Sequence, residues 1–288
     1  TKPKTRNAQF EHIAALREDF AKRGLPVISV DTKKKELVGR FKNPGESWEQ
    51  GPVLVKDHDF LSEADGKAIP YGIYDVRANL GAVVVGTTHD TAQFAIESIE
   101  LWWIEEGHAR YPHARELLIL ADGGGSNAAT NRAWKHGLYH QLAQRHGLTI
   151  TVAHYPPGTS KWNPIEHRLF SEISKNWAGR PLVSFGTVLN CIRSTKTRTG
   201  LRVTAHLLDR EYAVGLKVTD AQMRELDLTR HENLPRWNYT LSAGPNSVAT
   251  TPPRVRVPTH PSTAAREAPL DPLPPPLSPE PLPSGVPA

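Results

Sequence analysis

The chain has 288 residues, which is enough for one or two domains with a sizeable buried core. Lysine and arginine outnumber aspartate and glutamate by 35 to 30; the pI of about 9.3 suggests nucleic-acid binding, but only weakly, because the net charge of +5 is modest. A single cysteine, Cys191, excludes a disulfide framework and a multi-cysteine zinc site. No apolar run approaches the roughly 20 residues of a membrane span and no signal peptide opens the chain, so we expect a soluble intracellular protein.

The first predicted elements are a helix and a short strand. Residues 6–23 carry apolar side chains at helical spacing, and Gly24 and Pro26 end this helix. Residues 26–30 form an apolar run that predicts a buried strand ending on Asp31. Three consecutive lysines follow it: Lys33, Lys34 and Lys35. These lysines either blunt an exposed strand edge or contact phosphate groups, and the sequence leaves both interpretations open.

A hairpin and a second helix are predicted next. Residues 41–66 are polar and contain proline and glycine, which indicates an excursion outside the core. Residues 71–76 and 82–85 read as two strands joined by a hairpin turn at residues 78–81. Residues 90–93 resemble a capping box that opens a helix.

The most informative stretch is a strand that ends in a carboxylate. Residues 117–121 are apolar and are followed by Asp122 and three glycines, after which residues 127–146 show a helical pattern and residues 149–153 a further strand. Open α/β sheets place their ligands at the carboxyl ends of strands, and the glycines keep bulky side chains away from this aspartate. No Gly-Lys-Ser or Gly-Lys-Thr follows, so a phosphate loop is excluded. An aspartate at a strand end also serves as a turn or cap residue, and this alternative stays open here and for Asp31.

A third acid follows a loop rich in proline. Asn163 is a suitable N-cap, Pro164 suits the first helical position, and Glu166 falls three residues after the cap. Glu166 is therefore either a capping-box residue or, because helical geometry turns it toward the apolar side with Ile173 and Trp177, an inward carboxylate that needs a partner, a metal or water.

The last part of the chain changes composition abruptly. Helices are predicted at residues 182–193 and 219–226, with a basic loop at residues 195–202 between them. Beyond residue 242, proline dominates: 14 of the 25 prolines lie between residues 245 and 287. Such a tail cannot build a core, and we expect it to be a disordered or polyproline-type extension.

Several of these stretches resemble a known family. Residues 29–36, 121–127 and 157–170 are similar to the signature blocks of the ISAzo13-type insertion-sequence transposases. The likeness runs from about residue 1 to 241 and includes three further stretches, at residues 66–72, 197–201 and 237–240. This family belongs to the DDE transposases, so the resemblance implies an α/β protein whose catalytic domain is a ribonuclease H-like mixed β-sheet flanked by helices.

The resemblance also implies an activity. Asp31, Asp122 and Glu166 correspond to the three catalytic, metal-binding acids, which hold two Mg²⁺ or Mn²⁺ ions for DNA cleavage and strand transfer of the insertion sequence. In this interpretation Asp31 bridges the two ions. Side chains close to the acids in sequence are candidates for DNA contacts: Lys33, Lys34, Lys35, Lys161, Trp162 and Arg168. Trp162 either stacks on an unpaired base or packs against the protein.

Domain boundaries and partners follow from the same resemblance. Residues 1–24 would be the helical remnant of a DNA-reading N-terminal region that is otherwise missing, residues 25–241 the catalytic domain, and residues 242–288 the proline-rich tail. The expected partners are transposon-end and target DNA and a second copy of the chain, in the bacterial cytoplasm at the nucleoid. The truncation could impair the transposase activity. Two alternatives stay open: a nuclease of the same fold that cuts without joining, and an inactive or co-opted relic that binds DNA without catalysis.

Overall fold

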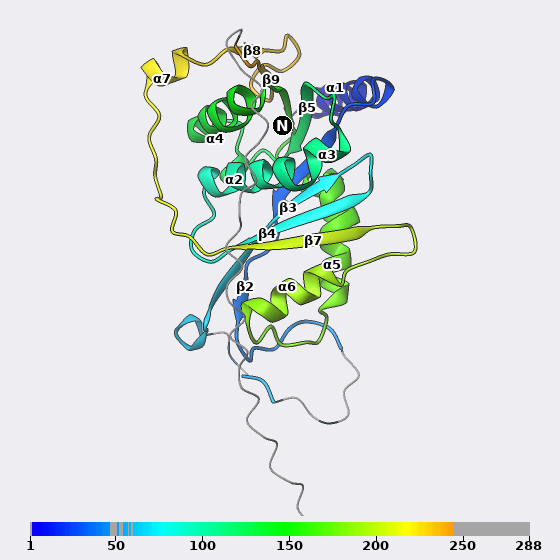
Figure 1. Ribbon diagram of the computed structural model, residues 1–288, viewed down its shortest axis with the longest axis vertical. Coiled ribbons are helices and arrows are strands. Elements are labelled where there is room, and N and C mark those ends of the chain that lie inside the picture. Colours follow the sequence, from blue (N-terminus) through cyan, green and yellow to red (C-terminus); the bar gives the residue numbers. More distant parts are fainter. Residues whose placement is uncertain (1, 47–50, 52–53, 57, 59, 245–288) are drawn as a thin grey trace, which may run out of the picture. The chain divides into compact units, whose positions relative to one another are not determined.

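The computed structural model describes residues 2–46, 51, 54–56, 58 and 60–244, and within them nine strands form one mixed sheet (Figure 1). The strand order is β7-β4-β3-β1-β5-β6-β9-β8, and β2 pairs with β3 beside this path. The strands are β1 (Val27–Thr32), β2 (Glu36–Val38), β3 (Gly66–Asp75), β4 (Leu80–Gly86), β5 (Glu116–Ala121), β6 (Thr149–His154), β7 (Arg202–Leu208), β8 (Leu228–Arg230) and β9 (Asn238–Leu241). The expected proline-rich tail falls, from residue 245 onward, outside the described residues.

Helices flank this sheet. They are α1 (Pro3–Lys22), α2 (Ala92–Trp102), α3 (His108–Arg110), α4 (Arg132–Gly137), α5 (Ser171–Asn176), α6 (Phe185–Arg193) and α7 (Asp220–Arg224). Three π-helical turns extend them: η2 (Trp103–Gly107) after α2, η4 (Leu138–Gln144) after α4, and η6 (Glu166–Phe170) before α5. Short 3₁₀ turns are η1 (Leu61–Glu63), η3 (Gly125–Asn127) and η5 (Ser160–Trp162). No helix in the described part of the chain has the length and apolar character needed to cross a bilayer.

The centre of the sheet combines antiparallel and parallel pairing. Strand β3 is antiparallel to both β1 and β4, whereas β5 lies parallel to β1 and β6 lies parallel to β5. The predicted hairpin at residues 71–76 and 82–85 is confirmed as β3 and β4, and the two predicted strands at residues 117–121 and 149–153 are confirmed as β5 and β6. This mixed sheet with flanking helices confirms the expected ribonuclease H-like fold.

Alternation along the strands separates the two faces of the sheet. Leu118 and Leu120 of β5 pack in one buried cluster with Val27 of β1 and with Ile13 and Phe20 of α1. Helix α1 is thus part of the same core as the sheet. The proposed boundary between residues 24 and 25 stays a prediction.

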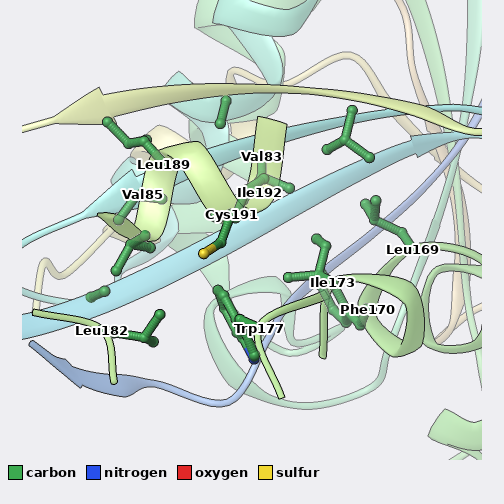
Figure 2. Close-up of a cluster of buried hydrophobic side chains, with 14 of the residues drawn as sticks. Val83, Val85, Leu169, Phe170, Ile173, Trp177, Leu182, Leu189, Cys191 and Ile192 are labelled. Carbon is green, nitrogen blue, oxygen red and sulfur yellow. The ribbon is translucent and has the colours of Figure 1, made fainter. Parts of the chain in front are cut away.

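A second buried cluster lies on the same face, between the hairpin strands and the helices that follow β6 (Figure 2). Figure 2 shows Trp177, Cys191 and Leu182 gathered beside Val83 and Val85, and Leu169, Phe170 and Ile173 beside one another. Two glycines let this layer approach closely. A Cβ at Gly72 would lie 2.5 Å from the Phe170 ring, and one at Gly81 would lie 2.5 Å from a Leu169 methyl group.

Two predicted helix starts were wrong by a few residues. The helix after Asp122 begins at Arg132 instead of residue 127, because Gly125 adopts a left-handed φ of 66° and residues 125–127 form a 3₁₀ turn. Asn131 then caps α4 by accepting hydrogen bonds from the N–H groups of Ala133 and Trp134. Helix α2 is capped by Thr91, not by Asp90, through a hydrogen bond from the Phe94 N–H at 3.2 Å.

The second cluster gives a stability prediction. Ile173 is fully buried in it, so Ile173→Ala is expected to lower the free energy of unfolding by about 2–5 kcal/mol through lost burial and a new cavity. The control is Leu216→Ala, because Leu216 is 55 % exposed and its truncation should change stability by less than about 0.5 kcal/mol. Urea denaturation measures both, and equal midpoints for the two variants would contradict the packing described.

Candidate active site

The three predicted acids come from segments that the fold brings to one end of the sheet. Asp31 is the fifth residue of the six in β1, Asp122 directly follows β5, and Glu166 begins η6. Val30 is paired with Ala121 in the parallel register, so Asp31 and Asp122 are the next residues along two adjacent strands. Alternation gives Asp31 the face of Val27 and Ser29.

The Glu166 turn is seated against that same face. Ile165 and Phe170 occupy the space above Gly72, where a Cβ would lie 2.8 Å from the Ile165 side chain. Gly72 is the partner of Asp31 in the β1–β3 register. The missing side chain at Gly72 therefore lets the turn that carries Glu166 approach the strand pair next to Asp31. A π-helical turn at this place is notable, because such turns recur at functional sites.

The carboxylates act on one another electrostatically. Burial raises the pKa of Asp31 to about 8, and the nearby charges of Asp122 and Glu166 add to this rise. Burial also raises the pKa of Glu166, with Asp122 as the next cause, while a hydrogen bond with Asp31 acts in the opposite direction. The pKa of Asp122 is raised by burial and lowered by a hydrogen bond from Asn163. Each acid is thus partly buried, and negative charges nearby act on Asp31 and Glu166.

This donor set has the chemistry of a site for a hard divalent cation. It offers carboxylate oxygens, which Mg²⁺ and Mn²⁺ prefer, and a cation would relieve the repulsion that raises the pKa of Asp31. The side chains are close without being fully convergent: in residues 2–46, 51, 54–56, 58 and 60–244, no three His, Cys, Asp or Glu side chains stand ready to hold one metal ion. Which acids bind metal stays a prediction.

The sequence predicted that Asn163 caps the helix of Glu166, but its side chain has other partners. Its fully buried carboxamide oxygen accepts a hydrogen bond from the Ser29 hydroxyl, and its nitrogen donates to Asp122 Oδ1 at 3.0 Å. The Ser29 hydroxyl in turn accepts from the Ile165 N–H at 3.2 Å. The Asn163 N–H donates to the Ser160 carbonyl at 2.8 Å, and the Glu166 N–H donates to the Asn163 backbone carbonyl at 3.1 Å. Neither hydrogen bond of a capping box is formed, so the capping-box interpretation of Glu166 is wrong. The Asn163 side chain instead ties β1 to the residue that follows β5.

A buried histidine supports Asp122 from the other side, and the sequence gave no sign of this role. His154 Nδ1 lies 3.0 Å from the backbone carbonyl oxygen of Asp122, and its Nε2 lies 3.4 Å from the Tyr239 hydroxyl. Burial lowers the pKa of His154 to about 4, so the ring is neutral near pH 7. The neutral ring therefore donates from Nδ1 to the carbonyl, while the Tyr239 hydroxyl accepts from Trp134 Nε1 at 3.0 Å.

A fourth acid, Asp90, lies close to Asp31. The sequence places Asp90 in a predicted capping box, so it was not among the predicted site residues. Asp90 accepts a hydrogen bond from the Thr32 hydroxyl at 3.1 Å and adds to the causes that raise the pKa of Asp31. Lys35 Nζ lies 3.7 Å from the Asp90 carboxylate. Since Thr91 caps α2, the Asp90 carboxylate is turned to the end of β1.

The six candidate DNA contacts divide into two groups. Lys33 is 8 % exposed, forms an ion pair with Glu36 at 2.9 Å and lies 4.5 Å from the centroid of the Trp177 ring, so its charge is engaged within the protein and its phosphate contact stays a prediction. The other five side chains are exposed: Lys34, Lys35, Lys161, Trp162 and Arg168. Trp162 is 60 % exposed and touches the edge of the Phe10 ring, with the ring centroids 6.1 Å apart.

The sheet order and the acids at adjacent strand ends define a ribonuclease H-like domain with an acidic site. Residues 1–243 match the family described as the Rhodopirellula transposase DDE domain, and the chain belongs to this family. The match gives no support to the expected N-terminal truncation, since it includes the first residues of the chain.

Solved structures show a more distant likeness. The Mos1 transposase paired-end complex with left transposon end is 13 % identical, with a TM-score of 0.42 over 65 % of this chain and 53 % of that one. The pre-cleavage Mos1 transpososome gives 13 % identity, a TM-score of 0.42 and coverage of 65 % and 54 %. The Mos1 mariner paired-end complex with Mn is 15 % identical, with a TM-score of 0.40 over 65 % of this chain and 53 % of that one. The chain thus spans about half the length of the Mos1 chains that it matches, and no curated protein matches it.

The crowded acids predict an unusual dependence of stability on pH. Asp31 keeps its proton in the folded chain up to about pH 8 but loses it near pH 4 when unfolded, so in EDTA the stability should fall as pH rises through this window. Asp31→Asn removes the titrating group, so its free energy of unfolding should not share this fall. The difference in unfolding free energy between the variant and the wild type should therefore shift in favour of the variant by at least about 1 kcal/mol between pH 5 and pH 8.

Denaturant titrations at pH 5, 6.5 and 8 measure this difference. Asp227→Asn is the matched control, because Asp227 is exposed and distant in sequence from the acids, and it should follow the wild type. Parallel pH profiles for the wild type and Asp31→Asn would show that Asp31 is not in the environment described.

Proposed function

We propose that the chain catalyses metal-dependent DNA cleavage and strand transfer of an insertion sequence, with Asp31, Asp122 and Glu166 as the metal-binding catalytic acids. One observation carries this proposal: three carboxylates from distant segments lie close together at the end of the central strands, where the charges of Asp122 and Glu166 add to the burial that raises the pKa of Asp31. Membership of a transposase DDE domain family supports it.

The three acids suit divalent metal chemistry. Two Mg²⁺ or Mn²⁺ ions, when bound, would activate the attacking water or 3′-hydroxyl and stabilise the leaving oxygen of the phosphodiester. Asp31 interacts with both Asp122 and Glu166, so these three acids together would hold the ions. Asp90 accepts a hydrogen bond from Thr32, the neighbour of Asp31, and acts on Asp31 through its charge. In this proposal Asp90 is a positioning residue.

The chain's own residues hold the acids in place. Asn163 donates to Asp122, which opposes the rise in the pKa of this carboxyl group that burial causes and fixes the direction of one of its oxygens. His154 fixes the backbone carbonyl of the same residue. Ser29 connects Asn163 to the first turn of the Glu166 helix. The two neighbours of Asp122 thus restrict the direction in which it points.

DNA is the proposed partner. The five exposed candidates near the acids would contact it: Lys34, Lys35, Lys161, Trp162 and Arg168. Because cleavage and joining of two element ends need two active sites, we also propose a homo-oligomer, acting at the bacterial nucleoid. The chain as a whole is basic, which suits this partner.

Substitution of each acid tests the proposal. Asp31→Asn, Asp122→Asn and Glu166→Gln should each lower Mg²⁺- or Mn²⁺-dependent nicking of the element's end DNA by 10³-fold or more, since each removes a metal ligand. Asp227→Asn should keep wild-type activity. Gel assays of end-labelled DNA, with and without EDTA, measure cleavage, and a second labelled duplex reports joining.

The outcomes separate the alternatives. Cleavage without joining would favour a nuclease of the same fold. DNA binding with no metal-dependent cleavage in the wild type would overturn the enzyme and leave a DNA-binding relic. Cleavage that survives in Asp122→Asn would remove this residue from the proposed site.

The role of Asn163 predicts a shift in the pH profile. Asn163→Ala removes the hydrogen bond that lowers the pKa of Asp122, so the acidic limb of the cleavage profile should move to higher pH. The variant should also lose about 1–3 kcal/mol of stability, because Ser29 and Asp122 lose a buried partner. Asn190→Ala, on the exposed side of α6, is the control. An unchanged limb with a lower maximal rate would show a purely structural role.

A further inference from the structure

A basic pocket lies outside the acid site and takes no part in the chemistry described above. It has a volume of about 590 Å³ and lies between the start of α4, helix α7, strand β8 and the turn before β9. Its lining contains five cationic side chains: Arg132, Lys135, Arg224, Arg230 and Arg236. Asp220 is the single acid among the described lining residues, so the pocket carries an excess of positive charge.

The protein itself neutralises little of this charge. Asp220 pairs with Arg132 at 2.6 Å, on an exposed rim. Arg230 donates to the backbone carbonyl of Pro235 at 3.1 Å, which is a neutral partner. The side chains of Arg224 and Arg236 form no ion pair with any of the described residues, and both are exposed.

Lys135 forms the buried wall of this pocket. It is 5 % exposed, its ammonium group donates to the Ala129 carbonyl, and it lies 5.1 Å from the centroid of the Tyr239 ring. Burial and the charges of Arg230 and Arg132 lower its pKa to about 8. A buried ammonium that faces arginines is stabilised when an anion enters between them.

We propose that this basic pocket binds a backbone phosphate of duplex DNA, and so anchors the duplex beside the acid site. Arginine forks match phosphate oxygens in geometry as well as in charge, and three of them surround this pocket without an acidic partner. The choice of DNA as the source of the phosphate rests on the function proposed above.

The position of the pocket allows one duplex to reach both sites. Ala129, in the pocket wall, is in the loop that begins with Asp122. The seven residue steps from Asp122 to Ala129 can span at most about 25 Å. This distance is shorter than one turn of DNA, which is roughly 34 Å long. The Tyr239 ring beside Lys135 also contacts His154, which holds the Asp122 carbonyl. A phosphate in the pocket would therefore be anchored to the same network that positions this acid.

The test measures DNA affinity without cleavage. A fluorescein-labelled 30-base-pair duplex is titrated with the full chain in EDTA at several salt concentrations, comparing the wild type with Arg224→Gln/Arg236→Gln. The double variant should bind about tenfold more weakly at 0.1 M salt, and its slope of log affinity against log salt should be smaller by about 1 to 2. Both side chains are exposed, so the fold should be retained, and circular dichroism checks this.

Two controls make the result specific. Arg115→Gln removes an exposed arginine at the opposite end of β5 and should leave both affinity and slope unchanged. Asp122→Asn, which should lose cleavage with metal, tests the proposed activity separately from the pocket. If the wild type does not cleave DNA with metal but its DNA binding still depends on the two arginines, the proposed activity is overturned and the pocket is not.

A second titration separates DNA from a small anion. Calorimetry with inorganic pyrophosphate is run on the wild type and on the same double variant. Unchanged duplex affinity and slope in the double variant would overturn the proposal. Pyrophosphate binding that depends on these arginines, alongside unchanged duplex binding, would overturn it as well and make the pocket a site for small phosphates.

Discussion

The carboxamide of Asn163 joins segments that lie far apart in the sequence. It accepts from Ser29 on β1 and donates to Asp122 after β5, and Ser29 accepts from the first turn of the Glu166 helix. All of these groups are withdrawn from solvent to a large extent, so a misplaced strand or helix would leave buried polar atoms without partners. This small network therefore couples the correct placement of three segments to the orientation of one acid.

Close approach of the helix layer is the second requirement. Gly72 and Gly81 lie on the face of the hairpin that meets Phe170 and Leu169, and larger side chains there would push η6 away from β1. The large apolar side chains around Trp177 then provide the burial energy that holds the layer down. The approach that packing demands is the same one that brings Glu166 toward Asp31, so core packing and site geometry depend on the same residues.

Local sequence rules predicted the parts of this fold in which local and tertiary demands agree. Strands β5 and β6 and the β3–β4 hairpin were predicted because apolar runs and turn residues mark them independently of their surroundings. The rules failed where one polar side chain had two possible uses. Asn163 has the sequence position of an N-cap and Asp90 that of a capping-box residue, yet both are recruited by β1, through Ser29 and Thr32. Spacing cannot reveal such a choice, since the competing partner is more than 50 residues away in the chain.

The acid site and the basic pocket share one electrostatic logic. In the protein alone, burial and like charges raise the pKa of Asp31 and lower that of Lys135, so each cluster holds charge that its surroundings disfavour. A cation would stabilise the first cluster and a phosphate the second, and a DNA strand bound through metal ions supplies both kinds of charge at once. The two clusters are connected by the loop from Asp122 to Asn131 and through Tyr239. Groups that favour a cation and groups that favour an anion therefore lie at the two ends of one short loop.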